Sequence, residues 1–236
     1  MWRRTPIFLW IWAAVAGLAF QPDTAMLRSM FQEALSRREK EFGNADPRTA
    51  QAARDLGLFL CRAGDGLAAR RAMASAVRID EKALGASAPQ TLEDLATLAS
   101  VSPRAEAEPL LRRAAESPDP TVAGPALTSL ADIRKTAGDR PAAAALLRRA
   151  LEKAALVDGQ DGPTVALILK SLVLVVPPNE GVGLMQRALA MDRQKLGPRS
   201  AQTMGDVRKL VTLLRATGRS ADAAQLEHEF KIASSR

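Results

Sequence analysis

The sequence has few side chains that could carry out catalysis. It contains one cysteine, one histidine and no tyrosine in 236 residues. Acid–base, nucleophilic and metal-assisted catalysis all need several reactive groups that converge on one place. Cys61 and His228 stand far apart in the chain, and no phosphate-binding loop of the form GxxxxGK[ST] occurs. We therefore expect no enzyme, no cofactor and no bound metal ion.

Aromatic residues are also scarce, which argues against a sheet protein. They make up 4% of the chain, and all three tryptophans lie within the first twelve residues. Alanine, a strong helix former, supplies much of the 47% that is apolar. Strands favour β-branched and aromatic residues instead. The composition predicts an all-α protein. Cys61, in the apolar context LGLFLCRAG, is expected to be a buried core thiol, and His228 a surface residue.

No block of five or six like charges occurs, so the chain lacks the usual signal for nucleic-acid binding. Its net charge is +7, from 33 basic and 26 acidic residues. Without the first twenty residues, which hold Arg3 and Arg4 and no acid, the 31 remaining basic residues leave a net charge of +5. This mild, dispersed positive charge therefore predicts that the protein binds no nucleic acid.

The first twenty residues form a separate segment. The basic start MWRRTP precedes an uncharged apolar run, Ile7–Phe20. A run of about 14 residues is short for a membrane span, and small residues near its end suit a signal peptidase. We predict that residues 1–20 are a signal peptide and that the protein is exported, either periplasmic or secreted, in a bacterial type of cell. The alternative is an uncleaved anchor that tethers an outward-facing protein to the membrane.

Residues 21–236 repeat one phrase. It reads RREKEFGNADPRT, then RIDEKALGASAPQT, then MDRQKLGPRSAQT. Nine residues before the glycine of each phrase stands an alanine, with apolar or small residues three and seven positions earlier, which places them on one helix face. The glycine is expected to end that helix with a positive φ. The alanine series is Ala34, Ala76, Ala114, Ala150 and Ala188.

A second helix is expected after each glycine, because most of the linkers carry a proline where a helix would start, as in NADPRT and SAPQT. Each unit is then a pair of antiparallel helices of about 40 residues. Such a unit cannot bury both of its faces alone, so the units must stack. The sequence predicts an α-solenoid of about five units, in which the first unit keeps only its second helix.

These units resemble the tetratricopeptide repeat (TPR), in the longer form of kinesin light chains. The likeness rests on Leu56-Gly57, Gly64, Ala69 and Ala76, recurs in later units and covers about residues 21–235. The chain departs from the pattern where units two and four lose about one turn of their first helix, at LASVSPRAEAE and LVVPPNEGVG. Glu227 replaces an apolar residue in the last unit, which predicts a partly solvated last helix.

The resemblance implies a non-catalytic scaffold that holds protein or peptide partners in the concave groove lined by first helices. Mapped by the Leu-Gly position, the candidate groove residues are Arg54, Asp55, Asp132, Lys135, Lys170, Arg208, Lys209 and Arg215. This lining is mostly basic, so an acidic segment or a C-terminal carboxylate is the natural guest. Two alternatives remain open: these charges form an ordinary solvated face, or the array is a membrane-tethered assembly protein. The basic row Arg113, Arg149 and Arg187 on second helices is interpreted as structural.

Overall fold

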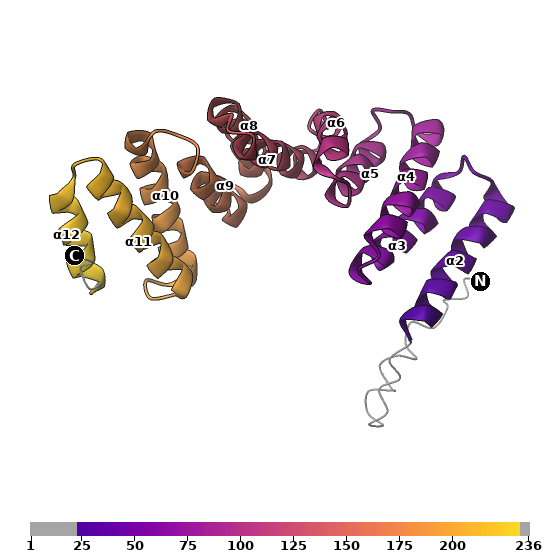
Figure 1. Cartoon of the computed structure of the whole chain (residues 1–236), viewed down its shortest axis with the longest axis horizontal. Helices are drawn as coiled ribbons and strands as arrows, with labels where there is room; N and C mark the ends of the chain where they lie inside the picture. Colours follow the sequence, from indigo (N-terminus) through magenta and orange to yellow (C-terminus); the bar gives the residue numbers. More distant parts are fainter. Residues whose placement is uncertain (1–22, 232–236) are drawn as a thin grey trace, which may run out of the picture. The chain divides into compact units, whose positions relative to one another are not determined.

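The computed structural model describes residues 23–231, and this part of the chain folds into eleven helices without a strand (Figure 1). The expected signal segment, residues 1–20, lies outside the described residues. The chain divides into two compact units with the boundary inside helix α4 (Gly66–Ala83). They are the N-terminal unit, Met1–Ile79, and the C-terminal unit, Asp80–Arg236. The prediction of an all-α array of helix pairs is confirmed.

The N-terminal unit contains α2 (Thr24–Phe42), α3 (Pro47–Arg62) and most of α4. Phe31 of α2 stacks on Phe59 of α3, with ring centroids 5.1 Å apart. A side chain at Gly57 would come within 2.8 Å of Met73, which is fully buried. Glycine is therefore needed where α3 and α4 cross, which gives the Leu-Gly motif its physical reason.

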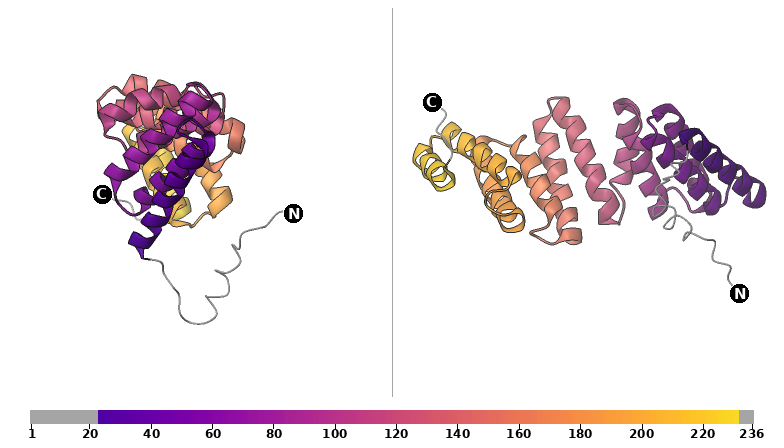
Figure 2. Two further views of the ribbon diagram at one scale, coloured as in Figure 1. Left: turned by 90° about the vertical axis from the view of Figure 1, so that its right-hand side faces the viewer. Right: turned by 90° about the horizontal axis from the view of Figure 1, so that it is seen from below.

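The C-terminal unit stacks eight further helices, and each packs against the next along the chain (Figure 2). Two of its first helices, α5 and α9, have 12 and 11 residues, whereas α7 and α11 have 17 and 16. This confirms the predicted loss of a turn in the first helices of the second and fourth sequence repeats. The eight helices are α5 (Pro89–Ser100), α6 (Arg104–Ala114), α7 (Pro120–Thr136), α8 (Arg140–Asp158), α9 (Pro163–Val173), α10 (Pro178–Leu196), α11 (Ala201–Ala216) and α12 (Ser220–Phe230).

The alanine register is confirmed in four of its five positions. Ala76, Ala114, Ala150 and Ala188 are completely buried, each on the second helix of its pair. Small residues at these positions let neighbouring helices approach closely. Ala34 is exposed, and α2 has no buried residue, because no described helix precedes it to cover that face.

The repeated sequence motif ends one helix and begins the next. Gly43, Gly85, Gly159 and Gly197 have φ between 77° and 100°, the left-handed region that favours glycine. Six residues after three of these glycines, a fully buried threonine donates its hydroxyl hydrogen bond to the glycine carbonyl. The three O–O distances are 2.8 Å for Thr49, 2.9 Å for Thr91 and 2.8 Å for Thr203. The threonine therefore ties the turn between one pair and the next.

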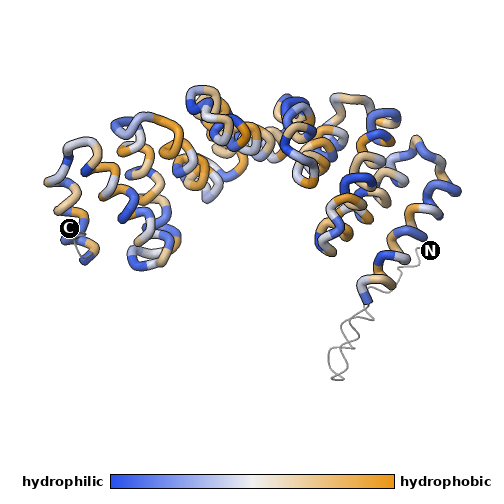
Figure 3. Tube along the Cα trace, in the orientation of Figure 1, coloured by the Kyte–Doolittle hydropathy of each residue, from blue (hydrophilic) through white to orange (hydrophobic). Residues whose placement is uncertain are grey.

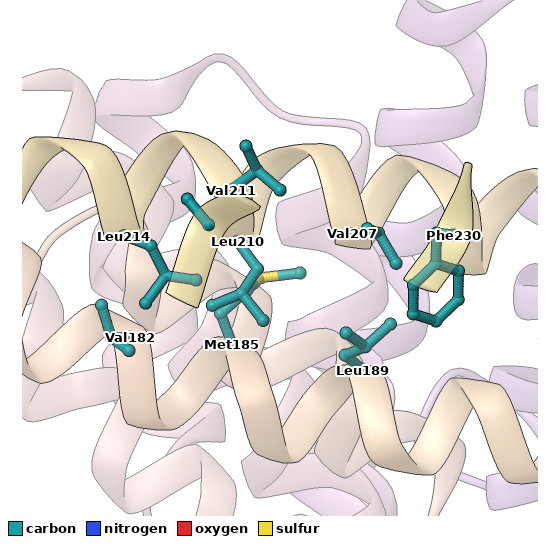
Figure 4. Packing of buried hydrophobic residues seen from close by; sticks show 9 residues of the cluster. Val182, Met185, Leu189, Val207, Leu210, Val211, Leu214 and Phe230 are labelled. Carbon is teal, nitrogen blue, oxygen red and sulfur yellow. The ribbon is translucent and has the colours of Figure 1, made fainter. Parts of the chain in front are cut away.

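The last two pairs share a hydrophobic core (Figure 4). Met185 and Leu189 of α10 face Leu210 and Val207 of α11, and Phe230 closes the cluster from α12. Along the helices, apolar and polar residues alternate with the helical period, as the hydropathy colouring shows (Figure 3). Packing of this kind removes apolar area from water and supplies most of the stability of each pair.

Two side-chain predictions are wrong. Cys61 is exposed, because the buried face of α3 runs through Leu56, Gly57 and Leu60 and position 61 turns away from it. Glu227 is 5% exposed rather than solvated. Both of its carboxylate oxygens accept hydrogen bonds from Arg215, at 3.0 Å each, so the charge is compensated in place.

Candidate binding surface

The eight predicted groove residues belong to different units. Arg54 and Asp55 lie on α3 in the N-terminal unit, and the other six lie in the C-terminal unit. Gln51 links the first two, because it accepts a hydrogen bond from Arg54 at 3.1 Å and donates one to Asp55 at 2.8 Å. Asp55 is exposed and Arg54 half-buried. Within the C-terminal unit we call the exposed side of α7, α9 and α11 the first-helix face.

On α7, Asp132 and Lys135 form an ion pair with each other. Their charged atoms are 2.6 Å apart, one turn along the same helix, and both side chains are exposed. An exposed pair of this kind contributes little to stability. Because the two charges cancel, α7 adds no net positive charge to the first-helix face.

Arg208 and Lys209 on α11 carry the unpaired positive charge of the face. Both are exposed, and neither forms an ion pair within residues 23–231. Arg215, one to two turns further along α11, is held by Glu227 of α12 instead. Of the predicted cationic residues on α11, Arg208 and Lys209 are thus available to a partner, and Arg215 joins two helices.

Lys170 lies beneath the face rather than on it. Its side chain is 13% exposed, and its ammonium contacts Asp192 of α10 and, at 2.6 Å, Asp206 of α11. Burial lowers the pKa of Lys170, but hydrogen bonds to the two carboxylates outweigh burial and raise that pKa above its ordinary value. Lys170 therefore connects three helices.

A groove between α7 and α9 was missed by the sequence reasoning. It encloses about 460 Å³ and is mostly apolar, and Leu167, 59% exposed, stands in its wall. Threonine, serine and proline carry no chemical signature in a sequence, so only an exposed leucine on a first helix could have pointed to it. The helical lining residues are Pro120, Thr121, Gly124, Pro125, Thr128, Ser129, Ala154, Val157, Thr164, Leu167, Ile168 and Ser171.

The groove and the basic pair lie on the same face. Ser171 is eight residues after the first residue of α9, and Lys209 is eight residues after the first residue of α11, so the two positions correspond. Both α9 and α11 pack against α10, so they are neighbouring first helices. Ser171 in the groove and the cation Lys209 therefore occupy equivalent positions on neighbouring first helices.

The second basic row has the structural role that was predicted. Arg113 donates to Glu81 at 2.7 Å and to the carbonyl of Ala86 at 3.3 Å, in the connection before α5. Arg187 donates in the same way to the carbonyl of Gln160, at 2.8 Å, in the connection before α9. Each arginine therefore connects the second helix of a pair to the turn at which the same pair begins.

The described residues contain no group of three or more histidine, cysteine or acidic side chains placed to hold a metal ion. His228 is exposed on α12, as predicted. None of the described helices combines the length and the apolar character that a membrane crossing requires.

Comparison with known proteins identifies the fold. BtubC (BKLC) from P. vanneervenii superimposes with a TM-score of 0.64 at 17% identity, over 92% of this chain and 95% of that one. A kinesin light chain-type protein of Podosopora anserina, with nearly identical TPR-like repeats, gives 0.61 at 18% identity, over 78% and 94%. No family model matches the sequence, and no curated protein does. The chain has the fold of TPR-like repeat proteins, as its sequence predicts.

Proposed function

We propose that this protein is a non-catalytic, exported scaffold that binds a protein segment on the first-helix face of its C-terminal unit. The observation that carries the proposal is the apolar groove between α7 and α9, together with the exposed pair Arg208 and Lys209 on the next first helix, α11. TPR-like folds generally mediate contacts between proteins, and the two solved structures named above have this fold.

The chemistry of the surface favours an extended, acidic segment with at least one apolar side chain. Leu167 and the prolines of α7 can cover the apolar side chain. Thr128 and Ser171 donate their hydroxyl hydrogens to their own helices, at 3.0 and 3.1 Å, so their oxygens remain acceptors for backbone N–H groups of a partner. Arg208 and Lys209 would meet carboxylates of the segment.

Export rests on the sequence of residues 1–20 alone. The uncharged run Ile7–Phe20 supports a signal peptide, and its alternative, an uncleaved anchor, would turn the same array into a tethered assembly protein. The mature N-terminus decides between them. Sequencing it should find a start near Gly17 or Phe20, and a mature chain that begins at Met1 would favour the tethered form.

The binding proposal is tested with the partner captured by the mature protein and identified by mass spectrometry. Titrations compare wild type with Arg208→Glu/Lys209→Glu at two salt concentrations. The charge reversal should weaken binding by at least about 1 kcal/mol, roughly fivefold, and high salt should weaken wild-type binding, since exposed charges are screened within about 8–10 Å. The matched control Arg37→Glu/Arg38→Glu changes the net charge by the same amount at two exposed, adjacent arginines of α2 and should bind like wild type.

Equal affinity of wild type and the α11 variant in both salts would show that the partner docks elsewhere. A loss of equal size in the control would mean that net charge alone drives the association. Substrate turnover by a purified, metal-free preparation would contradict the non-catalytic part of the proposal.

A further inference from the structure

Three ionisable side chains are buried together where α9, α10 and α11 meet. The side chains of Lys170, Asp192 and Asp206 are 13%, 8% and 4% exposed. Two carboxylates share one ammonium, so the fully ionised cluster carries one net negative charge away from water. Such a charge is costly to bury, and the simplest relief is one proton on one of the two carboxylates.

The contacts within the cluster are unequal. The Oδ2 atom of Asp192 contacts Lys170 and accepts a hydrogen bond from the Gln202 amide at 2.8 Å. The Oδ2 atom of Asp206 lies 2.6 Å from the same Lys170 ammonium. Because Asp192 has one more donor, its ionised form is the better stabilised of the two, and Asp206 is the natural site of a proton.

Few other charges reach the cluster. Among residues 23–231, the ionisable groups in contact there are Lys170 from α9, Asp192 from α10 and Asp206 from α11, and Gln202 of α11 is neutral. Lys195 of α10 lines a small cavity together with Asp192 and Gln202, at the edge of the cluster. The proton balance is therefore decided mainly by the two carboxyls and Lys170.

The pKa directions agree with this geometry. Burial raises the pKa of Asp206, and the neighbouring Asp192 raises it further, against the opposing effect of Lys170. Burial also raises the pKa of Asp192, but hydrogen bonds from Lys170, Asp206 and Gln202 outweigh burial and bring that pKa below its ordinary value. Over the interval between the two values, the pair holds one proton.

We propose that Asp192 and Asp206 share one proton in acidic solution and that this proton stabilises the packing of α9, α10 and α11 against one another. In the unfolded chain an aspartate titrates near its ordinary value, about 3.9. Since the folded pKa of Asp206 lies above that value, its proton stabilises the fold in full below about 3.9 and is lost as pH rises through the folded pKa. The folded pKa of Asp192 lies below the ordinary value. Its ionised form therefore stabilises the fold above about 3.9, and this stabilisation is lost as pH falls through the folded pKa.

The test is a carboxyl-carbon NMR titration of the whole chain, with wild type, Asp192→Asn, Asp206→Asn and the control Asp132→Asn. Wild type and the control should show one aspartate step above the ordinary value. In Asp192→Asn the step of Asp206 should fall by at least about one pH unit, as expected when a coupled carboxylate is removed. In Asp206→Asn only a low step should remain for Asp192.

Amide hydrogen exchange measures the stabilisation of this helix packing. Protection factors of α11 amides should rise in wild type as pH falls through the upper step and should stay constant in Asp206→Asn. A wild-type protein without a step above the ordinary value, or an upper step that survives in both single variants, would overturn the proposal. If Asp192→Asn fails to fold, wild type and Asp206→Asn still decide between these results.

Discussion

Replacing Lys170 by methionine should strongly destabilise the C-terminal unit. Methionine keeps the length and apolar stem of lysine but removes the one cation shared by Asp192 and Asp206. Both carboxylates are then left almost fully buried without their counter-ion. Removing one partner from a buried ion pair typically costs about 3–5 kcal/mol.

The size of this destabilisation depends on how buried the two carboxyls remain and on whether one of them takes up a proton. Because one of the two carboxyls can take up a proton once Lys170 is gone, the lower end, about 3 kcal/mol, is expected at pH 8. In a unit the size of Asp80–Arg236, each kcal/mol lowers Tm by about 2–4 °C, so Tm should fall by roughly 6–12 °C. At pH 5 the deficit should be smaller, since protonation relieves the repulsion.

The assay is thermal unfolding followed by helical circular dichroism at pH 8 and pH 5. Lys135→Met is the matched control, because Lys135 is also paired with an aspartate of the C-terminal unit but is exposed. Its cost should stay within about 0–1 kcal/mol, as for other surface pairs. Equal Tm values for wild type and Lys170→Met at pH 8 would refute the reasoning and would return Lys170 to the set of partner-binding candidates.

Three further predictions concern single positions. Ala150→Phe should overpack the completely buried crossing on α8 and cost about 1–3 kcal/mol; an unchanged urea-unfolding midpoint would show that the repeat register is wrong. Thr203→Val should cost about 1 kcal/mol, because the fully buried Thr203 loses its 2.8 Å hydrogen bond to the carbonyl of Gly197, and a variant as stable as wild type would contradict this. Cys61 is exposed, so a thiol reagent should modify it in the native protein as fast as in a short peptide; protection until unfolding would contradict its position.

The fold was predictable because its determinants are local and repeated. An alanine such as Ala150, the glycine nine residues later and the apolar residues three and seven positions earlier specify one helix with one buried face. When four or five units repeat this pattern in phase, stacking is the only way to bury both faces. The shortening of α5 and α9 was also predictable, because the missing turns are deletions in the repeat.

The candidate site was predicted less completely, because side-chain partners depend on which helices become neighbours. Lys170 meets Asp192 and Asp206 across three helices, and Arg215 meets Glu227 from the next helix. The periodicity of a single helix predicts that each of these residues is either an exposed charge or an acid at a position where other repeats have an apolar residue. The repeat supplies a hint in retrospect, since Asp80 and Asp94 recur at the same spacing as Asp192 and Asp206 and are likewise buried.

The groove was missed for a different reason. A sequence predicts a pocket through residues of recognisable chemistry, and Thr128, Ser129 and Ser171 have none. The free volume there results from how α7 and α9 pack and from the small side chains between them. The exposed apolar side chains of Leu167 on α9 and Val157 on α8 are the features that mark this groove.

The most direct test of the central claim is to find which face touches the partner. A photoreactive benzoyl-phenylalanine is placed at Leu167, in the groove, or at Arg148, exposed on the second helix α8. After irradiation with the purified partner, position 167 should form a cross-link and position 148 should not. Cross-linking from position 148, with none from position 167, would contradict the claim that this array binds through its first-helix face.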